Sequence, residues 1–130
     1  MIAADTSTWI AFLQGSAGND VDALDQALEE RRVLMPPPVL TELLSDPKLP
    51  PDVAKALRQV PLIEIATEYW ENAGALRAKV LARGNKARLG DALIAQSCIE
   101  RRIPLLTRDR DFRAFSQAGG FHLLHPASGG

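Results

Sequence analysis

The chain has 130 residues, of which 46% are apolar and 24% are charged, and its formal net charge is −1. This length suits one domain with a buried core, and the balanced charge excludes an overall basic field that would attract nucleic acid. The single cysteine excludes an internal disulfide, and with only two histidines a closed zinc site is not expected. No run approaches the roughly 20 apolar residues of a membrane span, and no signal-peptide pattern opens the chain. We therefore expect a cytoplasmic protein that does not bind a membrane.

Short apolar runs alternate with helical patterns in the first half of the chain. Met1–Ala4 is apolar and predicts a strand, while the polar residues D-T-S-T that follow it suit the start of a helix. Three consecutive prolines fix the backbone before another helix, since proline is tolerated in a first helical turn. The elements expected in this half are strands at 1–4 and 33–35 and helices over 9–13, from Asn19 or Asp20 to Glu30, over 39–44 and from Pro51 to Val60.

The second half continues the same alternation. A long helix is expected between Thr67, which can cap it, and Gly84, which suits its end; its apolar residues, Trp70 among them, repeat at helical spacing. The other elements expected are strands at 62–65, 103–106 and 121–124 and helices from Gly90 to about Arg101 and over 111–115. This order predicts an α/β fold with a mainly parallel central sheet flanked by helices on both faces. We expect one domain over 1–126 and a flexible tail at 127–130.

Four acidic residues lie in or directly after apolar stretches at widely separated positions. They are Asp5 in A-A-D-T-S, Glu42 in V-L-T-E-L-L, Asp91 in L-G-D-A-L-I-A and Asp109 in L-L-T-R-D-R-D-F. Asp5 and Asp109 follow predicted strands, so both are expected in the crevice beyond the carboxyl ends of a parallel sheet. Asp91 begins a helix, whose dipole stabilises its charge, and Glu42 can reach the same place from the third helix. Carboxylates gathered without histidine or cysteine are hard oxygen ligands suited to Mg²⁺ or Mn²⁺.

Such a site could use metal-activated water to hydrolyse a phosphodiester. Taken singly, each carboxylate could instead be a helix cap or a solvated surface residue. A phosphoaspartyl phosphatase is a rival enzyme reading because Asp5 ends a first strand, although Ser7 stands where that chemistry needs a second aspartate. A metal-binding interaction module without catalysis is a further alternative.

Taken together and in this order, these motifs closely resemble the PIN-domain toxins of the VapC type, from bacterial toxin–antitoxin pairs, over Met1 to about Leu124. The resemblance implies a PIN-like fold, Mg²⁺-dependent endoribonuclease activity on RNA, a VapB-type antitoxin partner and a homodimer. It also implies an acidic site of Asp5, Glu42, Asp91 and Asp109, in which Asp5 and Asp91 are expected to contact the metal directly.

The resemblance assigns supporting roles to hydroxyl groups and leaves one acid open. Thr107 matches a residue that hydrogen-bonds within the site, and Thr6 or Ser7 is expected to do likewise. The family's final motif often has asparagine two residues after the threonine and an aspartate further on, whereas here Asp109 and Asp111 stand two apart. Either aspartate could serve as the fourth acid, and Asp109 is preferred because it lies nearer the end of the strand.

Basic residues flank two of these motifs and are candidates for gripping RNA phosphates. They are Arg83, Lys86 and Arg88 before Asp91, and Arg108, Arg110 and Arg113 after the apolar strand at 103–106. Solvated helix ends, or ion pairs with nearby acids, are the alternatives for these groups. Trp9, Phe12 and Trp70 lie on helical stripes, which favours core or interface packing over base stacking.

Overall fold

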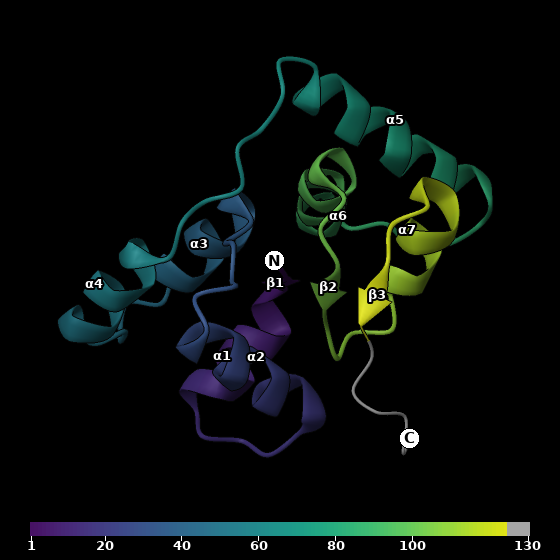
Figure 1. The fold of residues 1–130 in the computed structure, drawn as a ribbon. Coiled ribbons are helices and arrows are strands. Elements are labelled where there is room, and N and C mark those ends of the chain that lie inside the picture. The colour runs from purple at the N-terminus through teal and green to yellow at the C-terminus, as the bar shows by residue number, and fades with distance from the viewer. Residues whose placement is uncertain (125–130) are drawn as a thin grey trace.

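The structure is a computed structural model of the chain, and it describes residues 1–124. The predicted tail at 127–130 and the predicted domain end at 126 lie outside the described residues. Within them, strands alternate with helices along the chain, and Figure 1 shows the strands lying between two groups of helices. The predicted α/β fold with a parallel sheet between helices is confirmed.

The central sheet is short and parallel. Strand β1 (Ala3–Ala4) pairs with β2 (Leu105–Leu106), and β2 pairs in turn with β3 (Leu123–Leu124), which gives the order β1-β2-β3. Two isolated parallel bridges, Ile2 with Val33 and Met35 with Leu62, extend the pairing beyond β1. Because all of these segments run the same way, the residues that follow β1 and β2 emerge at the same edge.

Seven helices surround the sheet in the described part of the chain. They are α1 (Thr6–Leu13), α2 (Asn19–Glu29), α3 (Pro37–Leu44), α4 (Pro51–Gln59), α5 (Tyr69–Ala82), α6 (Leu89–Arg101) and α7 (Phe112–Gly119). Helices α5, α6 and α7 pack on one another above the strands in Figure 1, and α1 packs on α2 below them. Helix α3 contacts both α1 and α6, so it joins the two groups beside the carboxyl end of β1. No helix of this part is both long and apolar enough to cross a membrane.

Helix α6 is the most buried helix of the fold. Small residues on several of its sides, such as Ala92, Ala95 and Ser97, are fully buried, which lets α3, α5 and α7 approach closely. Burial also raises the pKa of the Cys98 thiol to about 12, so this cysteine packs as an inert core residue. The start of α6 is thereby fixed against the rest of the fold, and that start carries Asp91.

The long helix α5 differs from its predicted form in two respects. It begins at Tyr69 without a side-chain cap, so the predicted cap at Thr67 is wrong. Its buried stripe contains Tyr69, Ala73 and Val80, whereas Trp70 is 61% exposed. The Tyr69 hydroxyl donates a 2.6 Å hydrogen bond to the Leu93 carbonyl oxygen, which fixes the helix so that Trp70 points outward.

Other elements are shifted or reduced relative to the sequence prediction. The predicted strands at 33–35 and 62–65 are present only as the single bridges at Val33, Met35 and Leu62. Helix α3 begins two residues earlier than predicted, at Pro37, and α7 continues to Gly119 instead of ending at Phe115. Helix α2 is not capped by Asn19 or Asp20, since Gly18 occupies its N-cap position.

Candidate metal centre

Asp5 is the first acid beyond the sheet. It follows β1, caps α1 through a 3.0 Å hydrogen bond from the Thr8 amide, and is only 2% exposed. Ser7 Oγ lies 2.8 Å from both carboxylate oxygens, and Thr107 Oγ1 donates to Oδ2 at 2.6 Å. Burial raises the pKa of Asp5 above its ordinary value, although the hydrogen bonds from Thr107, Thr8 and Ser7 oppose that shift. These donors fix the carboxylate in one orientation.

Asp91 lies in the first turn of α6, where the helix dipole favours a negative charge. Burial is the largest cause that raises its pKa to about 6, and the charge of Asp109 is the next. The charges of Asp5 and Glu42 also raise the pKa of Asp91. Its Oδ2 atom is buried and accepts no hydrogen bond within the described residues. A cation bound beside Asp91 would favour the charged form of this carboxylate and offset the repulsion from the neighbouring acids.

Asp109 and Asp111 complete the acidic cluster on the loop after β2. One carboxylate oxygen from each of Asp91, Asp109 and Asp111 lies within 4.8 Å of the others. The Asp109 amide donates to Thr107 Oγ1 at 2.9 Å, and the Asp111 amide donates to Asp109 Oδ1 at 2.9 Å. Both candidates for the fourth acid therefore face Asp91, and the choice that the sequence left open stays open on geometry.

Glu42 approaches the cluster from α3. Its Oε1 atom accepts a 2.8 Å hydrogen bond from Thr6 Oγ1, and it lies 3.9 Å from where a Cβ of Gly90 would stand. Gly90 directly precedes Asp91, so Glu42 stands at the start of α6. The side chain is exposed, unlike that of Asp5. The structure thus brings all four acids of the predicted site to one place, from four separate segments.

The residues present fit a divalent cation. The unpartnered, buried Oδ2 of Asp91 and the close approach of three carboxylates each leave negative charge uncompensated. Every donor atom in this set is a carboxylate oxygen, which is the preference of Mg²⁺ and Mn²⁺ rather than of zinc. Asp5 is not among the three mutually closest acids, and its oxygens already accept hydrogen bonds from three donors, the Ser7 and Thr107 hydroxyls and the Thr8 amide.

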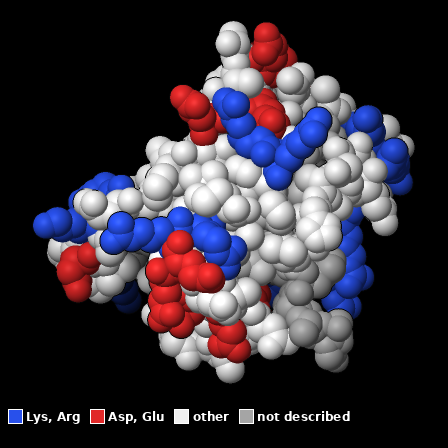
Figure 2. Space-filling view, in the orientation of Figure 1, with Lys and Arg blue, Asp and Glu red and all other residues white. Residues whose placement is uncertain are grey.

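Most of the basic residues predicted to contact RNA are exposed. They are Arg83, Lys86, Arg88, Arg110 and Arg113. The Lys86 ammonium lies 3.9 Å from Asp111 Oδ2, and the charge of Arg88 lowers the pKa of Asp91. On the face drawn in Figure 2, acidic side chains gather over α2 and again near the top of the view, and basic side chains lie in separate groups beside them, so this face has no continuous basic patch.

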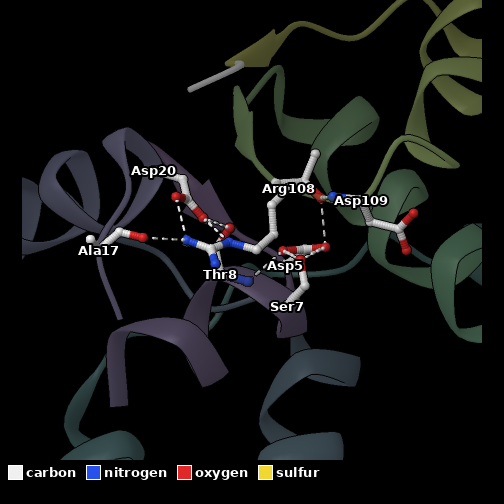
Figure 3. A network of polar contacts seen from close by, with 8 residues as sticks. Asp5, Ser7, Thr8, Ala17, Asp20, Arg108 and Asp109 are labelled. Carbon is white, nitrogen blue, oxygen red and sulfur yellow. Dashed lines mark hydrogen bonds and ion pairs between the residues drawn. The ribbon is translucent and has the colours of Figure 1, made fainter. Parts of the chain in front are cut away.

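Arg108 differs from the other basic candidates because its guanidinium is bound by a buried carboxylate, although its side chain is still 35% exposed. Its Nε and Nη2 atoms donate to the two oxygens of Asp20 at 2.8 Å and 2.7 Å (Figure 3). Asp20 is 1% exposed and accepts a further 2.9 Å bond from Thr8 Oγ1. Sequence reasoning missed this use of Thr8 and Asp20, because each alone has the pattern of a helix start. Nothing in one sequence pairs Asp20 with a residue 88 positions away.

The raised pKa of Asp91 makes a prediction for pH. Between the ordinary value of 3.8 and about 6, the folded protein holds a proton on Asp91 that the unfolded chain releases. Stability of the metal-free protein therefore falls as pH rises through this window. We expect Asp91→Asn to unfold at the same temperature as wild type near pH 4. At pH 7 we expect the variant to unfold at a higher temperature than wild type. The difference should be on the order of 1 to 2 kcal/mol once solvent screening is allowed for, and calorimetry without metal measures it. An equal difference at both pH values would contradict the assignment.

Comparison with known proteins identifies the family. A family model described as PIN domain matches residues 2–117. The chain belongs to the PIN domain family. Members of this family are typically nucleases, so the acidic centre lies where a hydrolase of phosphodiesters is expected. A search of the curated proteins finds no match to the chain.

Solved structures of toxin–antitoxin complexes share the fold. The chain resembles one in VapBC-5 from Mycobacterium tuberculosis, with a TM-score of 0.69 and 21% identity over 95% of this chain and 97% of that chain. It resembles one in VapBC2 from Rickettsia felis, bound to a DNA fragment from their promoter, with a TM-score of 0.71 and 18% identity over 96% and 98%. It also resembles a chain in FitAcB from Neisseria gonorrhoeae, with a TM-score of 0.70 and 17% identity over 98% of this chain and 99% of that chain. At these identities the likeness establishes the fold.

Proposed function

We propose that the protein is a Mg²⁺- or Mn²⁺-dependent endoribonuclease, the toxin of a VapBC-type toxin–antitoxin pair, acting in the cytoplasm. The observation that carries this proposal is the cluster of Asp91, Asp109 and Asp111, in which the buried Oδ2 of Asp91 has no hydrogen-bond partner among residues 1–124. Membership in a family of nucleases supports the hydrolytic part of the proposal. The sequence motifs and the neighbouring VapBC structures support the toxin part.

The acids of the centre would have different roles in hydrolysis. Asp91, Asp109 and either Asp5 or Asp111 would hold the ion, which when bound polarises a phosphoryl oxygen and acidifies water. A carboxylate of the cluster accepts the proton of the attacking water as its oxygen bonds to phosphorus and the ester oxygen leaves. Asp109 or Asp91 would orient that water. Glu42, which accepts a hydrogen bond from Thr6, would complete the ligand set directly or through water.

The surroundings of the centre favour a polyanionic substrate only when metal is bound. Four acids repel phosphate, whereas Lys86, Arg88 and Arg110 are exposed nearby and can contact phosphates on either side of the bond. Such contacts are electrostatic, so binding of RNA should weaken steeply as salt is raised. Arg108 is not available for this role while Asp20 holds its guanidinium.

The experiment that tests the proposal is RNA cleavage by the purified protein. Structured RNA is incubated with Mg²⁺, with Mn²⁺ or with EDTA, and Asp5→Asn is run alongside wild type. We expect cleavage that requires metal and is lost in the variant. Turnover of a phosphomonoester in place of RNA would support the phosphatase alternative. Metal binding without turnover of either substrate would leave an interaction module.

An apolar groove beside the acids supports the proposed protein partners. The groove has a volume of about 370 Å³ and is lined by Pro37, Pro38, Ile65, Trp70 and Leu89 among others, with Glu42 at its edge. Trp70 and Leu89 are 61% and 63% exposed. Large exposed apolar residues gathered in one place are typical of protein interfaces. This groove is our candidate for contact with a second copy of the chain.

Substitution of Trp70 tests that assignment. We expect Trp70→Ser to weaken self-association by about tenfold or more, because exposed tryptophans are frequent hot spots of interfaces. Light scattering coupled to gel filtration over a range of concentrations measures the mass. Leu81→Ser is the matched control, since Leu81 is 46% exposed on the same helix but does not line the groove. An unchanged mass profile for Trp70→Ser would remove this groove from the interface.

A further inference from the structure

A closed ring of contacts joins the start of α1, the start of α2 and the loop after β2. Asp5 accepts from the Thr8 amide, and the Thr8 hydroxyl donates to Asp20 at 2.9 Å. Asp20 binds the guanidinium of Arg108 with both carboxylate oxygens. Arg108 directly follows Thr107, whose hydroxyl returns to Asp5 at 2.6 Å. Figure 3 shows Arg108 reaching from the loop that carries Asp109 across to Asp20.

The bond between Arg108 and Asp20 restrains the relative positions of the segments that the ring joins. A bidentate contact between a guanidinium and a carboxylate fixes both distance and plane, which a single hydrogen bond does not. Arg108 Nη2 also lies 3.3 Å from the Ala17 carbonyl oxygen, so the loop between α1 and α2 is held as well. The Asp20 side chain is only 1% exposed, whereas that of Arg108 is 35% exposed, so the carboxylate side of the pair is shielded from water and the guanidinium side is partly open to it.

The backbone at Gly18 is shaped to leave room for the pair. Its φ of +153° lies in a region that favours glycine. A Cβ at this position would stand 2.6 Å from Arg108 Nη2 and 2.6 Å from Asp20 Oδ1. A side chain at this position would displace the two charged groups from each other and strain the backbone, so glycine favours the contact as observed.

Two residues of the ring, Thr107 and Arg108, connect it to the acidic centre. Thr107 Oγ1 donates to Asp5 and accepts from the Asp109 amide at 2.9 Å, so it joins two acids of the site. Arg108 lies between Thr107 and Asp109 in the chain, and its own backbone cannot move without moving both. Holding the guanidinium against α2 therefore holds the loop that presents Asp109 and Asp111 to Asp91.

We infer that Asp20 and Arg108 are positioning residues of the metal centre, which hold the loop after β2 so that Asp109 and Asp111 meet Asp91 around one divalent cation. This inference rests on the proposed function, because it concerns the ion of the same site. Neither residue touches the reacting atoms. Their effect on the centre is exerted through the placement of Thr107 and Asp109.

The sign of a change in metal affinity separates positioning from simple electrostatics. The positive charge of Arg108 lies close enough to Asp5 for each to stabilise the other's charged form. Removal of that charge alone would strengthen the binding of a cation, since less positive charge would remain near the site. Loss of positioning would instead weaken binding, because supporting residues of metal sites typically contribute about 10- to 100-fold in affinity.

The test measures Mn²⁺ alone, without RNA, by paramagnetic resonance of the free ion at a temperature well below unfolding. We expect Arg108→Met to raise the Kd for Mn²⁺ about tenfold or more, and Gly18→Ala to raise it in the same direction. Arg108→Lys keeps the positive charge but cannot form the bidentate bond to Asp20, so its Kd for Mn²⁺ should lie between those of Arg108→Met and wild type. Arg88→Met is the matched control, because it removes a positive charge that acts on Asp91 electrostatically and should leave Kd equal or lower.

An affinity of Arg108→Met that is equal to or tighter than that of wild type would overturn the inference. Should that variant fail to fold, the double variant Asp20→Asn/Arg108→Met carries no stranded buried charge and replaces it under the same expectation. Asp91→Asn separates the existence of the metal centre from the positioning role of Asp20 and Arg108. If wild type binds Mn²⁺ and Asp91→Asn does not, the proposed centre stands and only the positioning role is at stake. Absence of binding by wild type would remove the proposed centre and the inference together.

Discussion

Asp91→Asn is expected to lower kcat/KM for RNA cleavage by about 10³-fold or more, which corresponds to about 4 kcal/mol of lost transition-state stabilisation. Asp91 stands where the other acids converge, and its buried Oδ2 has no partner within the described residues. Supporting residues of metal sites already contribute about 10- to 100-fold, so loss of a direct ligand should exceed that range. Asparagine keeps the shape but removes the charge that a cation needs.

The control for this prediction is an acid of similar kind outside the site. Asp22 is exposed on α2, and Asp22→Asn should cleave RNA at the wild-type rate. Initial rates under subsaturating RNA, at several Mg²⁺ concentrations, give the comparison. The stability of the metal-free protein should meanwhile rise in Asp91→Asn at pH 7, because the repulsion from Asp109, Asp5 and Glu42 is relieved. A variant that cleaves within tenfold of wild type would show that Asp91 is not a ligand.

Arg108→Met is expected to destabilise the protein by about 1–3 kcal/mol at neutral pH, because the buried carboxylate of Asp20 loses its charged hydrogen-bond donor while water can replace part of that contact from the exposed side. Burial tends to raise the pKa of Asp20, but the bonds from Arg108 and Thr8 outweigh it and hold that pKa below its ordinary value. The stabilisation from this pair is therefore present above about pH 4 and is lost as pH falls through the pKa of Asp20 in the folded state. Urea denaturation at pH 7 and at pH 3 measures both quantities.

Arg32→Met provides the control for that stability measurement. Arg32 and Glu30 form an ion pair of 2.9 Å, close to the 2.7 Å of Arg108 and Asp20, but both side chains are more than 40% exposed. Surface pairs of this kind contribute about 0 to 1 kcal/mol. The double variant Asp20→Asn/Arg108→Met should regain part of the loss, since no buried charge is left unpaired. A loss below 1 kcal/mol in Arg108→Met would mean that water reaches Asp20 and that the ring is weaker than its geometry indicates.

The convergence of the acids could be predicted because it follows from topology. Asp5 directly follows β1, and Thr107 directly follows β2, so parallel pairing brings the two segments to one edge. Asp91 was predicted at a helix start and lies in the first turn of α6. The position of Glu42 needed only that α3 lie beside the same edge, and the early start of α3 at Pro37 leaves that placement intact.

Details that depend on one particular partner could not be predicted. Asp20 has the sequence pattern of a cap, and only the folded chain brings Arg108 to it. Trp70 and Tyr69 are adjacent aromatic residues, and either could begin the buried stripe of α5; the bond from Tyr69 to the Leu93 carbonyl decides between them. The strand predicted at 62–65 is apolar enough, but only Leu62 pairs, so composition alone did not determine the pairing.

The proposed activity requires a divalent cation held between the start of α6 and the loop after β2. Crystals grown with Mn²⁺ and measured for anomalous scattering test this most directly. We predict one strong peak within ligand distance of Asp91 and Asp109, absent in crystals of Asp91→Asn. Full density for the acidic side chains with no peak among them, or a peak elsewhere on the molecule, would contradict the account.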